Sequence, residues 1–413
     1  MKLMGRSAAL AAAGALLAGC GAGGPGGGGG KISDDKIVLA VLTDQSGVYA
    51  DLSGENAVQA VEMAVADFKK KYGDKAVATE IEVVSADHQN KPDIANTKAR
   101  ELYDRQKADM IVDVPTSSAA LAVANVAKGK KRVFISVGAA TTALTGEQCN
   151  KYTFHYGYNS YMLAHGTGTA LTKSGSKNWY LVYPDYAFGQ DMEKTFGAAV
   201  KGAGGTVVKS DPTPFPNDNF STFLLKAPDL DPKPDVIGAM QAGGDLVNLV
   251  KQYNEYKLRD EGVGLAVGLM FITDIHSLGP KALEGTRFTD FWYWNQDDDN
   301  RAWADRFKQE TGARPTAVHA GDYSAALQYL EAVQRAGTDA SDTVVKELEG
   351  HKVNDVFTST GTIRAEDHLL THDAYLAEVK PESEVSEPWD YEKIIETIPA
   401  AEAFQQPSPA CEL

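Results

Sequence analysis

Short apolar runs alternate with amphipathic segments along most of the chain from residue 36 onward. The first run, KIVLAVL, precedes the segment 54–72, in which apolar residues recur at three- and four-residue spacing and which ends at a glycine. Runs of the same kind are EIEVVSA, DMIVDV, RVFISV, NWYLVY, GTVVKS, DVIGAM and LAVGLMF, and helices are predicted from about residues 92 and 117 and over 160–174, 192–203 and 245–256. Strands that alternate with helices imply right-handed crossovers and mostly parallel sheets. Because the pattern forms two series, before and after Tyr158, it predicts two such sheets.

The last third of the chain departs from this alternation. The pattern predicts a strand over RFTDFWYW, helices over about 301–311, 317–336 and 341–350, and hairpin strands in GTIRAEDHLLTHDAYLAEV. A chain that returns to the first sheet and ends on the second would cross between two lobes more than once, as hinged folds do. Sequence order alone leaves that arrangement open.

The N-terminus has the features of an export signal. Lys2 and Arg6 precede a short apolar stretch that ends in Leu17-Ala18-Gly19-Cys20, so residues 1–19 are predicted to be a signal peptide. This quartet resembles the bacterial lipobox, in which the cysteine is lipidated, and ordinary cleavage that leaves Cys20 free is the alternative. Residues 20–35 are rich in glycine and are predicted to form a flexible tether. We therefore expect an exported protein that a lipid anchor holds at a membrane.

Composition limits the classes of partner. The hydrophobic share of 43% supports packed cores, and the formal charge of −16 comes without a Lys/Arg cluster, so we expect no nucleic-acid partner. Cys149 and Cys411 remain after Cys20. In an exported chain two such thiols tend to form a disulfide, and two buried free thiols are the alternative.

Common signatures of enzymes are missing from the sequence. There is no G-x-S-x-G, H-E-x-x-H or Walker A pattern, and His88 and His276 are not part of a closely spaced cluster of metal ligands. We therefore expect no catalytic residues, no metal and no cofactor. Two other classes stay open: a lipoprotein enzyme whose site only geometry would reveal, and a sensory ligand-binding module.

Several motifs occur together in a characteristic order: the lipobox, VLTDQSGVYADLSG, SADHQNK, VDVPTSSAALAVANVA, VFISVGAATTALTG, PDYAFGQ and RPTAVHAGDYSAALQYLEAV. In these motifs the chain resembles the type I periplasmic binding proteins, the leucine/isoleucine/valine-binding family that serves ABC importers. The resemblance covers about residues 36–399. The segments DYAFG and ITDIHSLG also resemble a branch of that family associated with aromatic and other organic acids.

The resemblance implies an α/β fold of two Rossmann-like lobes joined by a three-stranded hinge. The crossovers are expected near Tyr156, Phe291 and Gly361. Lobe one would comprise 36–156 and 292–362, lobe two 157–291 and 363–399, and a tail 400–413. The implied function is that of a monomer that captures a small organic carboxylate or an amino acid by hinge closure. It would deliver this ligand to an ABC permease and its ATPase subunits, in the periplasm or at the outer face of the cell membrane.

In open α/β sheets, ligands bind beyond the carboxyl ends of the strands, so candidate residues are sought in the loops that follow strands. In lobe one the candidates are Tyr49, Thr116, Ser117, Ser118, Gly138, Ala139, Ala140 and Thr141. Thr116, Ser117 and Ser118 stand at the start of a helix, where the backbone N–H groups favour an anion. The alternative is that these three residues cap the helix. In lobe two the candidates are Tyr186, Phe188, Gln241, Asp274 and His276, and Trp294 lies at the second crossover. Asp274 has two interpretations, a partner for a ligand ammonium or an N-cap.

Overall fold

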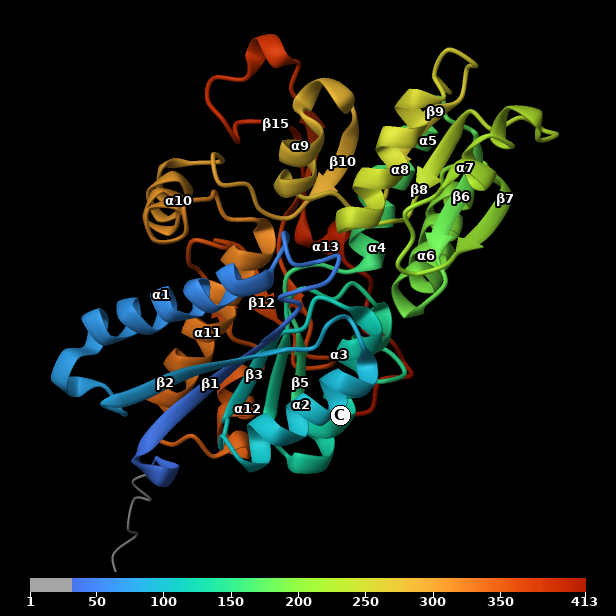
Figure 1. The fold of residues 1–413 in the computed structure, drawn as a ribbon. Helices are drawn as coiled ribbons and strands as arrows, with labels where there is room; N and C mark the ends of the chain where they lie inside the picture. The colour runs from blue at the N-terminus through green and yellow to red at the C-terminus, as the bar shows by residue number, and fades with distance from the viewer. Residues whose placement is uncertain (1–31) are drawn as a thin grey trace, which may run out of the picture.

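The computed structural model describes residues 32–413. The signal peptide, Cys20 and most of the glycine-rich tether lie outside the described residues. No helix in the described part is long and apolar enough to cross a bilayer. Figure 1 shows two sheets side by side, each covered by helices, with the last third of the chain returning to both.

Lobe one is built on a five-stranded parallel sheet in the order β2-β1-β3-β4-β5. Its strands are β1 (Lys36–Thr43), β2 (Glu80–Asp87), β3 (Met110–Asp113), β4 (Val133–Ser136) and β5 (Thr153–His155). Side chains of β1 alternate between two cores. Ile37, Leu39 and Val41 belong to one buried cluster, and Val38, Ala40 and Leu42 to the other. Both faces of this sheet are therefore buried, which explains its continuous apolar runs.

Helices cover the two faces of this sheet. They are α1 (Gly54–Tyr72), α2 (Pro92–Asp104), α3 (Ser117–Lys130), α10 (Asp298–Thr311), α11 (Ala317–Ala336) and α12 (Ser341–Leu348). Helix α11 packs against α1, and α2 packs against α3. The last third of the chain thus supplies helices to the lobe in which the chain begins.

Lobe two is built on a four-stranded parallel sheet in the order β7-β6-β8-β9. Its strands are β6 (Asn178–Pro184), β7 (Thr206–Thr213), β8 (Val236–Ala239) and β9 (Gly264–Val267). Its helices are α4 (Ser160–Leu163), α5 (Thr169–Lys173), α6 (Ala187–Gly202), α7 (Ser221–Leu224), α8 (Gly243–Glu255) and α9 (Ile272–Leu278). The expectation of two mostly parallel sheets with alternating helices is confirmed.

Two small antiparallel sheets complete the fold. One pairs β10 (Arg287–Asp290), β14 (Ala374–Val379) and β15 (Glu392–Ile398), and α13 (Ala400–Ala403) follows it. The other pairs β11 (Lys352–Val353), β12 (Gly361–Ile363) and β13 (Leu370–Thr371).

The predicted strand over RFTDFWYW was only partly right, because β10 ends at Asp290. Of the predicted hairpin, β12 and β13 pair with each other, whereas β14 pairs with β10 and β15. The backbone after Asp290 turns away from the sheet and its aromatic side chains pack into the body, so periodicity alone could not find the end of the strand.

The contacts of residues 364–371 bear on where the chain crosses between the lobes. Leu369 bridges to His155 in parallel orientation, and His155 N–H donates to the carbonyl of His368 at 3.0 Å, so this segment lies beside β5. We therefore propose that the third crossover lies between β13 and β14, about ten residues after Gly361. The crossovers near Tyr156 and Phe291 stay predictions, and they fall directly after β5 and β10.

A disulfide joins Cys149 and Cys411, whose Cα atoms are 5.4 Å apart. The bond closes a sequence separation of 262 residues and holds the tail on lobe one. Arg364 supports the tail as well, by donating from its guanidinium to the carbonyl of Gln405 at 2.6 Å.

Candidate ligand-binding cleft

The loops that follow the strands of both sheets meet around a small enclosed cavity of about 10 Å³, which is room for about one water molecule. Its lining residues are Tyr49, Leu52, Pro115, Ala140, Tyr158, Tyr186, Phe188, Ala242 and Leu269. They follow β1, β3, β4 and β5 of lobe one and β6, β8 and β9 of lobe two. The cavity therefore lies where the carboxyl ends of two parallel sheets face each other, the usual place for a ligand in such folds.

Direct contacts between the lobes close this cavity. The hydroxyl oxygens of Tyr49 and Tyr186 lie 2.5 Å apart, and Gly244 N–H donates to the carbonyl of Val48 at 3.2 Å. Beside the cavity, Thr142 donates from its N–H and its hydroxyl to Asp191, both at 2.8 Å. The structure thus has the two lobes in contact across the cleft.

Aromatic rings form a large part of the wall, and further rings outside the lining pack against them. Tyr186 stacks on Phe215 with ring centroids 4.3 Å apart, and Tyr158 stacks on Phe291 at 4.6 Å. Burial raises the pKa of the hydroxyls of Tyr49, Tyr158 and Tyr186 well above the ordinary tyrosine range, so all three stay protonated at neutral pH. The wall combines apolar ring faces with hydroxyl donors.

The loop after β3 places hydroxyls at the start of α3. The hydroxyl of Thr116 donates to Asn90 Oδ1 and makes no side-chain cap for the helix, so the capping interpretation of Thr116 was wrong. Ser117 is 1% exposed, and its hydroxyl has no hydrogen-bond partner among the described residues. Ser118 is half-buried on the first turn. The unpartnered Ser117 hydroxyl and the first N–H groups of α3 are neutral donors that closely follow Pro115, which lines the cavity.

The loop after β4 approaches its neighbours closely. A Cβ at Gly138 would lie 2.7 Å from the Cα of Pro115, so only glycine fits. The carbonyl of Gly138 accepts from the Tyr158 hydroxyl at 2.7 Å, and that of Ala139 accepts from His155 Nε2 at 2.7 Å. Ala140 lines the cavity, whereas the Thr141 hydroxyl is buried and accepts from Ala143 N–H at 3.3 Å.

Two lobe-two candidates lie near the cavity but do not line it. Gln241 is fully buried; its amide nitrogen donates to Thr213 at 3.2 Å, and its Oε1 has no partner among the described residues. Asp274 is the third residue of α9 and not its N-cap, which is Phe271, so the N-cap interpretation was wrong in position. Its carboxyl still caps the helix start by accepting from Phe271 N–H at 2.9 Å. Burial raises the pKa of Asp274 to about 7.

His276 and Trp294 are held by other aromatic residues outside the cavity lining. The His276 ring stacks on Trp389 at 3.7 Å and its Nδ1 lies 2.8 Å from the Tyr391 hydroxyl. Trp294 is buried and donates from its indole N–H to the carbonyl of Trp389 at 2.7 Å. His276 lines a neighbouring pocket of about 330 Å³ at the lobe boundary.

The structure adds cavity residues that the motifs did not single out, namely Leu52, Pro115, Tyr158, Ala242 and Leu269. Each lies in a loop after a strand, and this position is the signal that could have found them. None of the residues that line the cavity carries a charge. Among the described residues, no three His, Cys, Asp or Glu side chains are grouped to hold a metal ion.

Comparisons with known proteins agree with this geometry. Residues 36–384 match the family described as periplasmic binding protein. A periplasmic binding protein from Burkholderia mallei is 44% identical over 90% of this chain and 96% of its own, with a TM-score of 0.86. A branched chain amino acid ABC transporter periplasmic ligand-binding protein from Burkholderia xenovorans is 35% identical over 90% and 97%, with a TM-score of 0.79.

A third solved structure shares the fold at lower identity. It is an ABC transporter solute-binding protein of Rhodopseudomonas palustris in complex with benzoate, 21% identical over 92% of this chain and 100% of its own, with a TM-score of 0.78. A search of curated proteins finds no match.

Proposed function

Because the chain belongs to the periplasmic binding protein family, we propose that it captures a small organic carboxylate between its lobes for import by an ABC transporter. The observation that carries this proposal is the cavity between the lobes. Its lining residues come from the segments that follow seven of the strands. A ligand that touches both lobes favours their closed arrangement by its differential affinity for it. The Tyr49 and Tyr186 hydroxyls, which now contact each other, would separate and donate to the ligand.

The absence of charged residues from the cavity lining narrows the ligand class. Neutral donors can hold a carboxylate at the start of a helix, and we propose this role for the unpartnered Ser117 hydroxyl and the first N–H groups of α3. A ligand ammonium would find no acid in the lining, and the carboxyl of Asp274 is engaged as a cap. We therefore favour an aromatic or aliphatic monocarboxylate over an amino acid, and the stacked rings of Tyr186 and Phe215 favour a planar body.

The same family also bears on the cellular location and the transport partners of the protein. We propose that Cys20 carries the lipid anchor, that the tether keeps a monomer close to the membrane outside the cytoplasm, and that a permease with its ATPase subunits receives the ligand. Tethering raises the effective concentration of the protein at its permease. The family is one of binding proteins, and we propose no catalytic step.

A thermal-shift panel tests the proposed ligand class. The intact protein is heated with benzoate, 4-hydroxybenzoate, hexanoate, leucine and glutamate. A ligand at a hundred times its dissociation constant adds about 2.7 kcal/mol to the stability of the folded state, which raises the melting temperature visibly. We expect a shift with at least one monocarboxylate. A shift with leucine alone would move the proposal to amino acids, and no shift with any compound would contradict it.

A further inference from the structure

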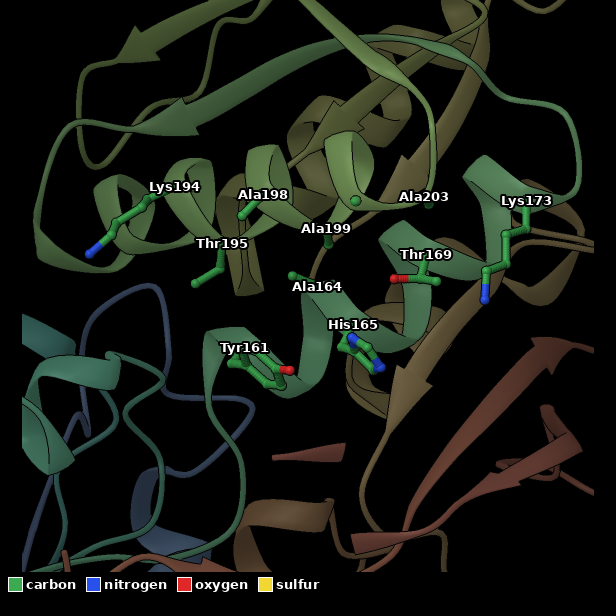
Figure 2. A pocket seen from close by; sticks show the side chains of 11 residues that line it. Tyr161, Ala164, His165, Thr169, Lys173, Lys194, Thr195, Ala198, Ala199 and Ala203 are labelled. Atoms are coloured by element: carbon green, nitrogen blue, oxygen red, sulfur yellow. The ribbon is translucent and has the colours of Figure 1, made fainter. Parts of the chain in front are cut away.

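A second cavity lies within lobe two, between α6 and the helical segment formed by α4 and α5. Its volume of about 420 Å³ lies within the range of about 300–1,000 Å³ usual for small-molecule sites. Figure 2 shows side chains of both helical segments facing this groove, with Lys194 near one end and Lys173 near the other. The groove shares no lining residue with the cleft cavity.

The floor of the groove is apolar and made of small side chains. Ala164, Ala198, Ala199 and Ala203 line it, so no large side chain fills the space between the helices. The helices approach closely next to the floor, where a Cβ at Gly168 would lie 3.2 Å from Phe196 Cδ1. Such a floor favours the apolar body of a ligand.

A π-helical turn over residues 164–168 forms one wall. Thr289 of β10 contacts this turn: its hydroxyl donates to the carbonyl of Leu163 at 3.3 Å, and its N–H donates to the Thr167 hydroxyl at 2.8 Å. A side chain that satisfies a helix carbonyl in this way interrupts the regular ladder, and π turns are frequent at functional sites. The turn places the ring of His165 parallel to that of Tyr161, with centroids 5.5 Å apart and planes at 6°.

The charges around the groove are positive. Lys173 is exposed on α5, and Thr169 lies one turn before it on the same helix face. Lys194 is exposed on α6, and no aspartate or glutamate is among the lining residues. This local excess of positive charge occurs in a chain whose net charge is −16. The groove therefore suits an anion.

We propose that this groove is a second binding site, which takes a small organic carboxylate with a planar apolar body. The ligand ring lies over the alanine floor beside Tyr161 and His165, and the carboxylate meets Thr169 and Lys173. Lys194 adds to the positive potential from the other end. This site goes beyond the proposed function, which needs only the cleft between the lobes.

Equilibrium dialysis of radiolabelled benzoate against the intact protein tests this site. We expect Lys173→Gln to weaken groove binding about tenfold or more, because the carboxylate loses its cation. Ala198→Leu should abolish that binding by filling the groove, and the exposed position of Ala198 allows the variant to fold. Lys201→Gln is the matched control, since Lys201 is an exposed lysine of α6 outside the groove lining, and it should change affinity less than about twofold.

The stoichiometry separates this inference from the proposed function. If both sites bind benzoate, two molecules bind per chain and Ala198→Leu leaves one. If the cleft does not bind benzoate, one molecule binds, and Ala198→Leu removes it while Tyr49→Phe does not affect it. Benzoate binding that Lys173→Gln and Ala198→Leu both leave unchanged would overturn the second site, as would the absence of saturable binding at millimolar benzoate.

Discussion

Tyr49 and Tyr186 face each other from opposite lobes at the wall of the cleft cavity. Each presents a protonated hydroxyl among aromatic rings, and Phe215 contacts both, with ring centroids at 5.9 Å and 4.3 Å. In a dry site, a hydroxyl that loses its partner retains a large desolvation cost. The two hydroxyls satisfy each other, and a ligand oxygen is the natural replacement for either partner.

Replacing either tyrosine by phenylalanine tests this role. We expect Tyr49→Phe and Tyr186→Phe each to weaken carboxylate binding by about 1–1.5 kcal/mol, close to tenfold, through the loss of one hydrogen bond. Isothermal titration calorimetry measures the change. Tyr183→Phe, a half-buried tyrosine of β6 outside the cavity lining, is the control. If all three variants bound the carboxylate with the affinity of the parent, the tyrosine pair would have no role in recognising the ligand.

Because the carboxyl of Asp274 is buried, it makes the stability of the folded protein depend on pH. Its folded pKa of about 7 lies above the unfolded value near 3.8, so its proton favours the folded state. Stability is unaffected by this group below the unfolded value and falls as pH rises from about 4 to 7. Asparagine can accept the Phe271 N–H without a charge. We expect Asp274→Asn to be as stable as the parent near pH 4 and about 2 kcal/mol more stable at pH 8, measured by urea unfolding.

The control for this prediction is Asp260→Asn, which alters an exposed carboxyl of lobe two that does not act on Asp274. It should leave the difference between pH 4 and pH 8 nearly unchanged. A destabilised Asp274→Asn at pH 8 would show that the ionised carboxylate is the better cap.

At the scale of single residues, sequence reasoning found Tyr49, Ala140, Tyr186 and Phe188 because each follows a strand, and a parallel sheet collects such loops at one edge. It did not predict that Trp389 of the loop 380–391 would contact both His276, which stacks on its ring, and Trp294, which donates to its carbonyl. Which distant loop covers a residue depends on tertiary packing, and no local period encodes it. The ligand-binding roles themselves stay predictions.

At the level of structural elements, a disulfide bond holds the C-terminal tail on lobe one. The Cys149–Cys411 disulfide restricts a long loop in the unfolded chain, which is the main source of disulfide stabilisation in the chain-entropy account. We expect Cys411→Ser to lower the free energy of unfolding by roughly 2–4 kcal/mol, measured with urea. Reduction of the parent should give the same loss. A variant as stable as the oxidised parent would show that contacts such as Arg364 to Gln405 hold the tail alone.

Hydrophobic periodicity predicted the helices and strands of both parallel sheets, because each element buries a face of its own. It failed at residues 291–294, where aromatic residues that resemble a strand pack as a loop, with Trp292 donating to the carbonyl of Val356 at 2.9 Å. Bulky apolar residues satisfy a strand pattern and a buried loop equally well.

For the whole molecule, two adjacent glycines of lobe two lie at the contact between the lobes. Gly243 has φ of +55°, and a Cβ there would lie 2.4 Å from the carbonyl oxygen of Val48 in the other lobe. At Gly244 the nearest atom is Val48 Cβ at 3.9 Å, an ordinary contact. The two neighbours thus differ in whether a methyl group is compatible with closure.

We expect Gly243→Ala to hold the lobes apart and to weaken carboxylate binding about tenfold or more. Part of this loss is the strain of alanine at positive φ. Gly244→Ala should bind within about threefold of the parent, since its methyl group meets no obstacle. Calorimetry gives the affinities, and small-angle scattering of each variant with ligand reports whether the lobes close. Comparable affinities in the two variants would contradict closure through this contact.

Two lobes could be predicted from two series of strands and helices, but the contacts between them could not. Those contacts depend on individual pairs such as Thr142 with Asp191, whose partners are 49 residues apart and belong to different lobes. No pattern along the chain relates such residues before the fold brings them together.

The most direct measurement of the central claim is a crystal structure of the protein grown with the monocarboxylate that gives the largest thermal shift. We expect its carboxylate within hydrogen-bonding distance of Ser117 or the first N–H groups of α3, and its body between Tyr49 and Tyr186. A ligand found only outside the cleft, with the Tyr49 and Tyr186 hydroxyls still in contact, would contradict capture between the lobes.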